Sequence, residues 1–307
     1  MEEILLHQYD RSPFSEKIRK IFAWKKIAWR SVDQPIVAPK PKLTPLTGGY
    51  RKIPVLQIGA DIYCDTALIA RVLEERHPQP SCFPGGNVGA CEIVAQWADH
   101  WLFMAAVPPA LAKIVHALPP EFMPQFMKDR EAMSPGFTIA NMTAALPDCR
   151  SRLVAATDWL ESQIQGRDFF FGSDFSVADA ACFHVLWFLR NDPESFAGVE
   201  SQPALRRWFE RIEAMGNGVV TPLDPDDALD IARRSLPLTP DSGDPKDPNG
   251  LAPGDRVSIV PDDYGVEVVT GVLVRTSPRD IAIRREDSSV GEVVVHFPRV
   301  GYRVTRC

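Results

Sequence analysis

Short apolar runs and one amphipathic segment alternate at the start of the chain. Residues 4–9 form an apolar run that ends at a polar cluster, which is typical of a buried strand. Apolar positions then recur at helical spacing from Phe14 to Phe22, after a serine and a proline that suit a helix start. Residues 27–32 form a second apolar run. The pattern therefore predicts a strand, a helix and a second strand.

A loop and two further strands follow. Residues 33–52 contain four prolines and two glycines, which favour a loop with at most a short helix. Residues 53–58 and 62–64 have the composition of a hairpin around a glycine turn. A helix is expected after them, as far as about His77, where prolines begin. This order of elements predicts a thioredoxin-like domain over residues 1–78.

Helical periodicity without strand signals dominates the middle of the chain. A long amphipathic stretch covers residues 139–163, and Pro108-Pro109 is expected to interrupt an earlier helix. The Ser176-Val-Ala-Asp179 segment is a capping-box pattern, and the helix after it is apolar nearly all round. Such a helix belongs at the centre of a bundle. Residues 91–235 are therefore predicted to form an all-α domain.

The period changes to two in the last part of the chain. Residues 235–253 are rich in Pro, Asp, Ser and Gly, and are predicted to be a linker. Beyond them apolar residues alternate with polar ones, for example at Val266 and Val268, and turn signals lie between the runs. Five short strands are expected, forming a small closed or half-closed β-barrel over residues 253–307. The predicted fold class is multidomain: thioredoxin-like α/β, all-α and small all-β.

Charge and composition exclude several classes of function. The 307 residues are 45% hydrophobic, so the chain can bury cores, and its 28 prolines are expected in loops and at helix starts. The net charge of −6 argues against a nucleic-acid partner, because phosphate binding needs clustered Lys and Arg. No apolar run approaches the ~18 residues of a membrane-spanning helix, so no membrane partner is expected.

Cysteine usage and the start of the chain bear on the compartment. Six cysteines are scattered without a C-x-x-C pair or the spacing of metal ligands, so we expect free thiols and no metal. The opening MEEILLHQYD is acidic where a signal peptide would be basic. We therefore expect a cytoplasmic protein.

Three segments in order resemble the N-terminal domain of cytosolic glutathione transferases: YDRSPFSEKIRKIFAWKKI, KIPVLQIG and CDTALIARVLEERHP. The segment FFFGSDFSVADAACFHVL is similar to part of that family's helical second domain. The resemblance covers about residues 1–216 and leaves the last strands outside it. It implies glutathione as cosubstrate, an electrophilic small molecule as its partner in a detoxifying conjugation, and a homodimer.

Ser12 corresponds to the residue that contacts the glutathione sulfur in this family. The physics of its position agrees, because a helix N-terminus offers unpaired N–H groups and a partial positive charge, and a hydroxyl adds a donor. The alternative is that Ser12 only caps its helix, since the two roles compete for one hydroxyl. Tyr9 and Ser15 are rival hydroxyls, which fit better as a core aromatic and a first-turn polar residue.

The resemblance also implies the residues that bind the peptide. Pro54 would follow a cis bond, and the backbone of Ile53 would pair with the cysteinyl unit. Asp65 and Thr66 match the family's acidic–hydroxyl pair, in which a helix N-terminus suits the γ-glutamyl carboxylate and the acid suits its ammonium. Ordinary helix capping is the alternative. Cys64 is expected to be a buried small hydrophobe, not a catalytic thiol.

The resemblance gives less definite partners for the glycine carboxylate and for the electrophile. The glycine carboxylate has three candidate partners, Lys40, Lys42 and Lys52, each of which is a solvated lysine in the alternative interpretation. Trp101 and Met104 lie where the first helix of the second domain would line the electrophile pocket, although a stripe of this kind also suits a core.

Two other functions stay open at this stage. The chain would be a non-catalytic binding module if its C-terminal barrel recognised a partner, or a glutathione-dependent reductase or isomerase if only the electrophile differed. Residues 253–307 contain equal numbers of acidic residues and arginines, which argues against strong phosphate binding by the barrel.

Overall fold

The computed structural model describes residues 3–237, 244 and 247–307. It divides into two compact units. The first contains the described parts of Met1–Ser15, Ala28–Val72 and Val220–Cys307, and the second contains Glu16–Ile27 and Leu73–Val219. Part of the predicted linker, residues 238–243 and 245–246, lies outside the described residues.

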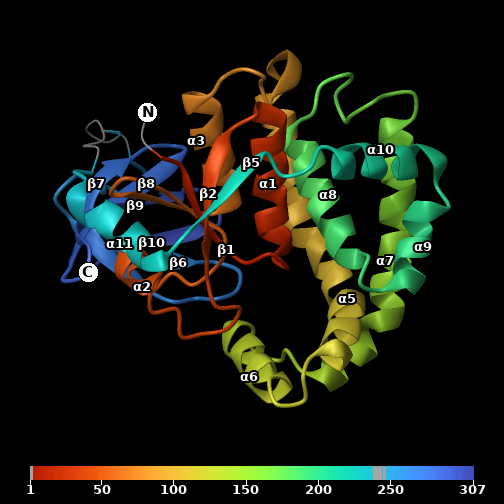
Figure 1. The fold of residues 1–307 in the computed structure, drawn as a ribbon, viewed down its shortest axis with the longest axis horizontal. Coiled ribbons are helices and arrows are strands. Elements are labelled where there is room, and N and C mark those ends of the chain that lie inside the picture. Colours follow the sequence, from red (N-terminus) through yellow and green to blue (C-terminus); the bar gives the residue numbers. More distant parts are fainter. Residues whose placement is uncertain (1–2, 238–243, 245–246) are drawn as a thin grey trace. The chain divides into compact units, whose positions relative to one another are not determined.

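A single ten-stranded sheet organises the first unit (Figure 1). Its order is β10-β6-β7-β8-β9-β4-β3-β1-β2-β5. The strands are β1 (Leu5–Gln8), β2 (Ala28–Asp33), β3 (Val55–Ile58), β4 (Asp61–Cys64), β5 (Val219–Leu223), β6 (Arg256–Pro261), β7 (Val269–Thr276), β8 (Asp280–Asp287), β9 (Gly291–Pro298) and β10 (Tyr302–Arg306). β1 pairs in parallel with β2 and antiparallel with β3, and β4 pairs antiparallel with β3, as a thioredoxin-like domain requires.

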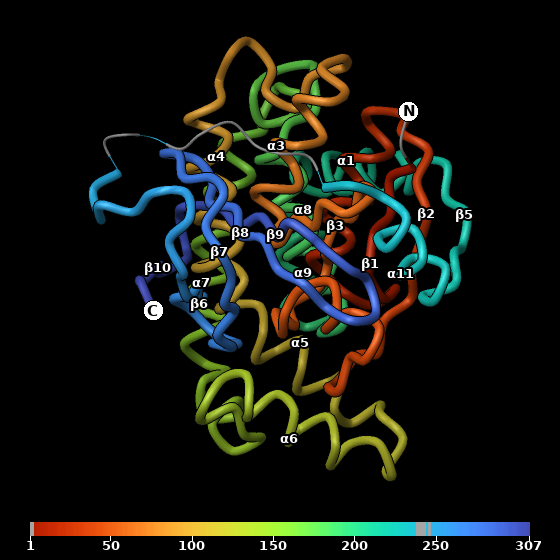
Figure 2. The backbone as a smooth tube through the Cα atoms, turned by 90° about the vertical axis from the view of Figure 1, so that its left-hand side faces the viewer, coloured from red at the N-terminus to blue at the C-terminus, as the bar shows by residue number. Residues whose placement is uncertain are grey.

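The C-terminal strands continue this sheet. β9 pairs in parallel with β4, with Ile62 opposite Val295, and β8, β7, β6 and β10 follow it in antiparallel pairs. Figure 2 shows β7, β8 and β9 side by side. Within the described residues no pairing closes these strands into a barrel. The expected closed barrel is therefore not formed by these strands, and they extend the sheet from the edge of β4, whose backbone groups bond to β9.

One hydrophobic core holds the two parts of the sheet together. Buried residues from the loop before β3 and from β3 and β4, such as Leu43, Val55 and Ile62, cluster with Val293 and Phe297 of β9. The residues predicted as a separate third domain therefore share a sheet and a core with the thioredoxin-like part.

A strand and a helix replace the end of the predicted all-α domain. β5 joins the sheet beside β2, and α11 (Pro225–Arg234) packs Ala228 against Leu5 and Val32. Leu229 and Ala232 of α11 enter the core shared with β9. Sequence periodicity missed β5 because this edge strand is largely exposed and shows no alternation of buried residues.

The remaining helices of the chain are as follows: α1 (Pro13–Lys25), α2 (Thr44–Thr47), α3 (Thr66–Arg76), α4 (Val88–Trp97), α5 (Phe103–Ala117), α6 (Met123–Met133), α7 (Ile139–Ile164), α8 (Val177–Leu189), α9 (Pro193–Glu200) and α10 (Pro203–Ala214), with a 3-10 turn at Pro84–Gly86 and a π-helical turn at Ala98–Leu102. The predicted long helix over residues 139–163 is confirmed by α7. The predicted interruption at Pro108-Pro109 is wrong, since both prolines lie inside α5.

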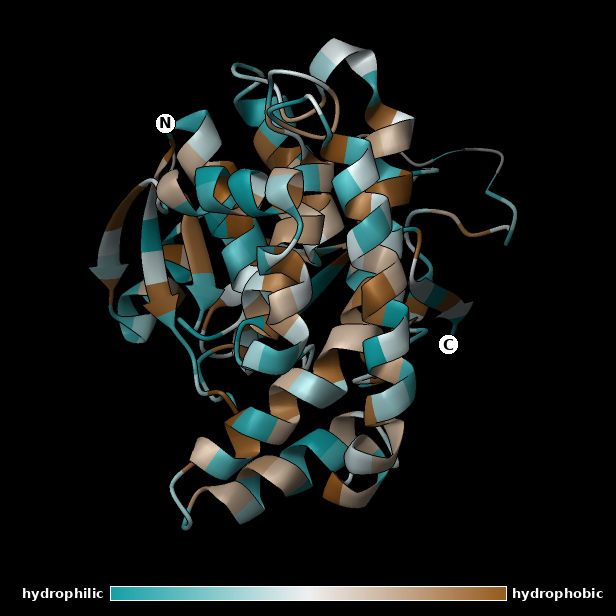
Figure 3. Ribbon diagram, turned by 90° about the vertical axis from the view of Figure 1, so that its right-hand side faces the viewer, coloured by the Kyte–Doolittle hydropathy of each residue, from teal (hydrophilic) through white to brown (hydrophobic). Residues whose placement is uncertain are grey.

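The second unit is built around α8. This helix is buried along almost its whole length and packs against α4, α5 and α9, as its apolar sequence predicts. Figure 3 shows apolar and polar residues alternating around the helices, which is typical of amphipathic helices in a bundle. None of the helices in the described residues is long and apolar enough to cross a membrane.

Candidate functional site

Ser12 lies directly before α1 and is only 2% exposed. Its Oγ accepts the N–H of Ser15 at 3.2 Å, so the capping role is present. This contact uses a lone pair of the oxygen and leaves the hydroxyl hydrogen to donate elsewhere. The two roles that the sequence analysis set against each other are therefore compatible.

The rival hydroxyls lie close to Ser12 along the chain. Ser15 is fully buried in the first turn of α1, and its Oγ has no hydrogen-bond partner in the described part of the chain. Such atoms are rare in folded proteins, so the first turn carries an unsatisfied polar group. Tyr9 is half-buried after β1, and the Lys40 ammonium lies 5.8 Å from its ring centroid.

The Ile53–Pro54 peptide bond is cis, as the resemblance implies. Pro54 is buried and Ile53 is half-buried. β3 begins only at Val55, so the backbone of Ile53 lies outside the strand ladder of β3. The position expected to pair with the cysteinyl unit is therefore a backbone segment outside the strand pairing of β3.

Asp65 and Thr66 form the start of α3. Asp65 adopts a left-handed backbone conformation with φ +78°, which Asp tolerates better than most residues. Its Oδ1 accepts the N–H of Ala67 at 2.8 Å, and its Oδ2 accepts the hydroxyl of Tyr302 at 3.1 Å. The carboxylate thus caps α3 and also contacts the C-terminal strand β10.

All three candidate lysines have partners within the first unit. Lys40 is buried and donates to the carbonyl of Pro35, and Lys42 pairs with Asp226. Lys52 pairs with Asp263, in the loop between β6 and β7. Lys40 and Lys52 are thus largely shielded from solvent, whereas the Lys42 side chain is 42% exposed, as a solvated lysine would be. Lys52 resembles Asp65 in contacting the C-terminal part of the chain.

The tryptophans predicted as an aromatic stripe in the second unit pack together in a cluster. Trp101 is half-buried and stacks on Trp97 and Trp159, with ring centroids 5.7 and 6.1 Å apart. Met104 is 53% exposed. Trp159 of α7 was not predicted as a member, because its neighbours in the cluster come from a helix far away in the sequence.

Cys64 is fully buried at the end of β4. Burial, and then the neighbouring Asp65 carboxylate, raise the pKa of its thiol well above the usual value. A thiol that stays protonated is a poor nucleophile. The expectation of a buried hydrophobe at this position is confirmed.

A buried charged group in the second unit escaped the sequence analysis. Lys17 of α1 is fully buried and pairs with Asp99 at 2.5 Å, and His184 of α8 lies 2.9 Å from the other oxygen of Asp99. Burial raises the pKa of Asp99, but the Lys17 ammonium and His184 outweigh it and hold that pKa below its usual value. The histidine within the apolar helix α8 was the available signal.

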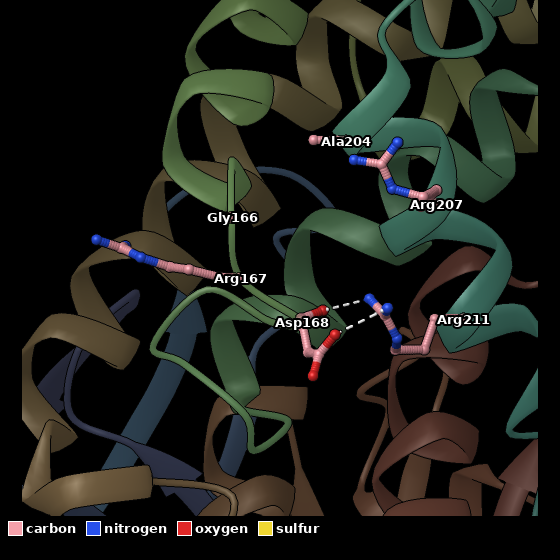
Figure 4. Close-up of a pocket in the computed structure, with 6 residues that line it drawn as sticks. All are labelled: Gly166, Arg167, Asp168, Ala204, Arg207 and Arg211. Carbon is pink, nitrogen blue, oxygen red and sulfur yellow. Dashed lines mark hydrogen bonds and ion pairs between the residues drawn. The ribbon is translucent and has the colours of Figure 1, made fainter.

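A surface cavity of about 260 Å³ lies elsewhere in the second unit (Figure 4). Three arginines approach it, and Arg211 pairs with Asp168 at 2.8 Å. The lining residues are Gly166, Arg167, Asp168, Ala204, Arg207 and Arg211. None of the predicted site residues is among them.

Comparison with known proteins places this chain in a family. The model of the glutathione S-transferase N-terminal domain matches residues 6–81, and that of the C-terminal domain matches residues 143–211. A GST-like protein from Pseudomonas syringae is 39% identical, with 100% of each chain covered and a TM-score of 0.77. The chain belongs to the glutathione S-transferase family. The match covers the whole of both chains, so the C-terminal strands of this transferase family member are shared with the Pseudomonas protein.

More distant structures share the fold of this transferase family member. A glutathione S-transferase from Rhodospirillum rubrum F11 is 17% identical over 69% of this chain and 88% of that chain, with a TM-score of 0.53. A glutathione S-transferase of Ceriporiopsis subvermispora in complex with glutathione is 18% identical over 70% of this chain and 99% of that chain, with a TM-score of 0.51. No similar sequence was found among the curated proteins.

Proposed function

We propose that the protein conjugates glutathione to an electrophilic small molecule, and that Ser12 donates a hydrogen bond to the glutathione thiolate. The observation that carries this proposal is the buried Ser12 at the N-terminus of α1, whose hydroxyl hydrogen is not used by its capping contact. Membership of the family supports chemistry of the glutathione-transferase type in general.

The proposed role of Ser12 is to lower the pKa of the bound thiol. The partial positive charge at the start of α1, together with a hydrogen bond donated by the Ser12 hydroxyl, favours the thiolate over the thiol. Each unit by which the pKa falls corresponds to about 1.4 kcal/mol. The thiolate then attacks the electrophilic atom, a sulfur bond forms there, and the leaving group departs with its electron pair. The thiol proton passes to solvent.

The remaining residues would hold the peptide. The backbone of Ile53 would pair with the cysteinyl unit, the Asp65 carboxylate with the γ-glutamyl ammonium, and Thr66 at the start of α3 with the γ-glutamyl carboxylate. Lys40 and Lys52 are the proposed partners of the glycine carboxylate, with Lys52 shared between that group and Asp263. Trp101 and Met104 are the proposed contacts of the electrophile.

Replacement of Ser12 by alanine tests the proposal. Ultraviolet titration of bound glutathione should show a thiol pKa at least about one unit below that of free glutathione. A free cysteine thiol has a pKa of about 8.5. In Ser12→Ala the pKa should return toward the free value, and kcat/KM should fall about tenfold or more, since one pKa unit corresponds to a factor of ten.

The exposed Ser173 offers a matched control, because Ser173→Ala removes a hydroxyl from a surface loop. It should leave both the pKa and kcat/KM unchanged. The role given to Ser12 would be contradicted if glutathione bound to the wild type kept the thiol pKa of free glutathione, or if glutathione bound to Ser12→Ala had the same lowered thiol pKa as in the wild type.

A further inference from the structure

The residue Tyr302, at the start of β10, reaches the proposed glutathione site from the C-terminal end of the chain. It is 8% exposed, and its hydroxyl lies 3.1 Å from Asp65 Oδ2 and 3.2 Å from the Tyr50 hydroxyl. The three side chains come from β10, from the start of α3 and from the loop before β3, all within the first unit.

The direction of these hydrogen bonds follows from the groups involved. A carboxylate only accepts, so the single hydrogen of the Tyr302 hydroxyl serves Asp65, and the oxygen of Tyr302 can accept the hydroxyl of Tyr50. Burial raises the pKa of both tyrosines well above the usual value, so both keep their hydrogens. The arrangement is a short chain of donors that ends on Asp65.

The two oxygens of Asp65 are thereby fixed in direction without loss of charge. Oδ1 accepts from the N–H of Ala67 and Oδ2 from Tyr302, and both donors are neutral. Each carboxylate oxygen has about two acceptor sites, so one on each remains for a further donor. Within the described residues no cation pairs with Asp65, whereas Lys52 is paired with Asp263. A charged, oriented acceptor of this kind suits an ammonium group.

Packing holds Tyr302 in place. Its ring centroid lies 5.4 Å from that of Phe297, which lies 5.8 Å from that of Tyr50, and all three rings are buried. Arg51, directly after Tyr50, pairs with Glu267 at 3.3 Å. Buried rings fixed by their neighbours keep a hydroxyl within the narrow range of positions that a binding site needs.

We propose that Tyr302 is a positioning residue, which orients the Asp65 carboxylate to bind the α-ammonium group of a γ-glutamyl ligand. This inference rests on the proposed function for the identity of the ligand. The C-terminal strands then complete the γ-glutamyl subsite, in addition to extending the sheet.

The test uses S-methylglutathione, which keeps the γ-glutamyl ammonium but has no thiol to be activated by Ser12. Tyr302→Phe removes only the hydroxyl. Calorimetry of the full-length protein should show binding weakened about five- to tenfold, as expected for one hydrogen bond to a charged group. The same substitution should not change the affinity for an S-methylglutathione analogue that lacks the α-amino group.

Two variants complete the test. Thr305→Val removes another hydroxyl from β10, which bonds to Ser258, and should not change the affinity. In the Asp65→Asn background, Tyr302→Phe should have no further effect, because the charge that Tyr302 orients is gone.

The possible results separate the two proposals. Affinity that is unchanged or higher in Tyr302→Phe overturns the positioning role, and higher affinity would mean that the hydroxyl competes with the ammonium. Wild-type protein that fails to bind S-methylglutathione overturns it as well. A weakening by Tyr302→Phe supports it even if Ser12→Ala leaves the thiol pKa of glutathione unchanged, since that result concerns Ser12 alone.

Discussion

His7, in the interior strand β1 of the first unit's sheet, is a buried group whose pKa lies far from its usual value. It is fully buried in β1, its Nε2 lies 2.8 Å from Gln57 Oε1, and its Nδ1 lies 3.2 Å from Gln34 Nε2. Because Nδ1 faces an amide nitrogen, it accepts, and Nε2 carries the hydrogen. Burial lowers the pKa of His7 to about 4, although the bond to Gln57 raises it.

This shift predicts acid sensitivity. Between pH 6.5 and about 4 the unfolded chain binds a proton at His7 that the folded chain excludes, so the free energy of unfolding falls as the pH falls. At pH 4.5 the loss due to His7 should be about 2 to 3 kcal/mol relative to pH 7.5. Urea unfolding of wild type and His7→Gln at the two pH values measures it, since the variant lacks this contribution.

The exposed His116 provides the control, and His116→Gln should follow the wild type at both pH values. If the free energy of unfolding of His7→Gln fell as much as that of the wild type between the higher and the lower pH, burial of His7 would not be the cause of the acid sensitivity.

At the residue scale, the sequence predicted groups whose signals are local. Ser12, Asp65 and Thr66 each stand at a helix start, where the residue type itself indicates a cap or an anion site. Tyr302 carries no such signal, because its partner Asp65 lies more than 200 residues earlier and only the folded sheet brings the two together.

The start of α8 is fixed by a buried capping box. Asp179 is fully buried and accepts four hydrogen bonds: from the N–H and hydroxyl of Ser176 at 2.9 and 2.5 Å, from Phe170 N at 2.9 Å and from Trp208 Nε1 at 2.8 Å. The predicted capping box is thus confirmed, and it also ties α10 and the preceding loop to α8.

Asp179→Ala should destabilise the protein strongly. It leaves buried donors without an acceptor, and we expect the free energy of unfolding to fall by about 3 to 5 kcal/mol. Asp174→Ala removes an exposed carboxylate from the same loop and should change it by less than about 0.5 kcal/mol. Denaturant unfolding followed by circular dichroism distinguishes the two. Equal midpoints for the two variants would contradict the structural role of Asp179.

The elements that the sequence missed are those defined by long-range pairing. Val266 and Val268 alternate as a strand would, but they lie in the loop between β6 and β7 and are exposed, because alternation alone provides no partner strand. Conversely, β10 was not predicted, since its sequence Tyr302–Arg306 is mostly polar and its strand state depends on pairing with β6.

On the scale of the first unit, the C-terminal strands are part of the fold and not an appended module. Removal of residues 253–307 would strip β9 from β4 and expose core residues such as Leu43, Val55 and Ile62. We expect the truncated chain to aggregate or to bind a hydrophobic dye, and the isolated segment 253–307 to lack cooperative unfolding.

Deletion of the exposed terminal residue Cys307 alone should leave the melting temperature unchanged and serves as the control. Two fragments that each unfold cooperatively would instead support the separate C-terminal domain expected from the sequence. That result would also support the alternative function, in which residues 253–307 form a binding module.

The pairing of β9 with β4 has a consequence for how the chain is made. More than 200 residues separate the two strands, so at about 5–20 residues per second a ribosome releases β9 some tens of seconds after β4. During that interval β4 is an unprotected edge able to pair with other chains. The N-terminal domain therefore completes its folding only after β9 has left the ribosome, and the nascent chain is the stage at which it most needs a chaperone.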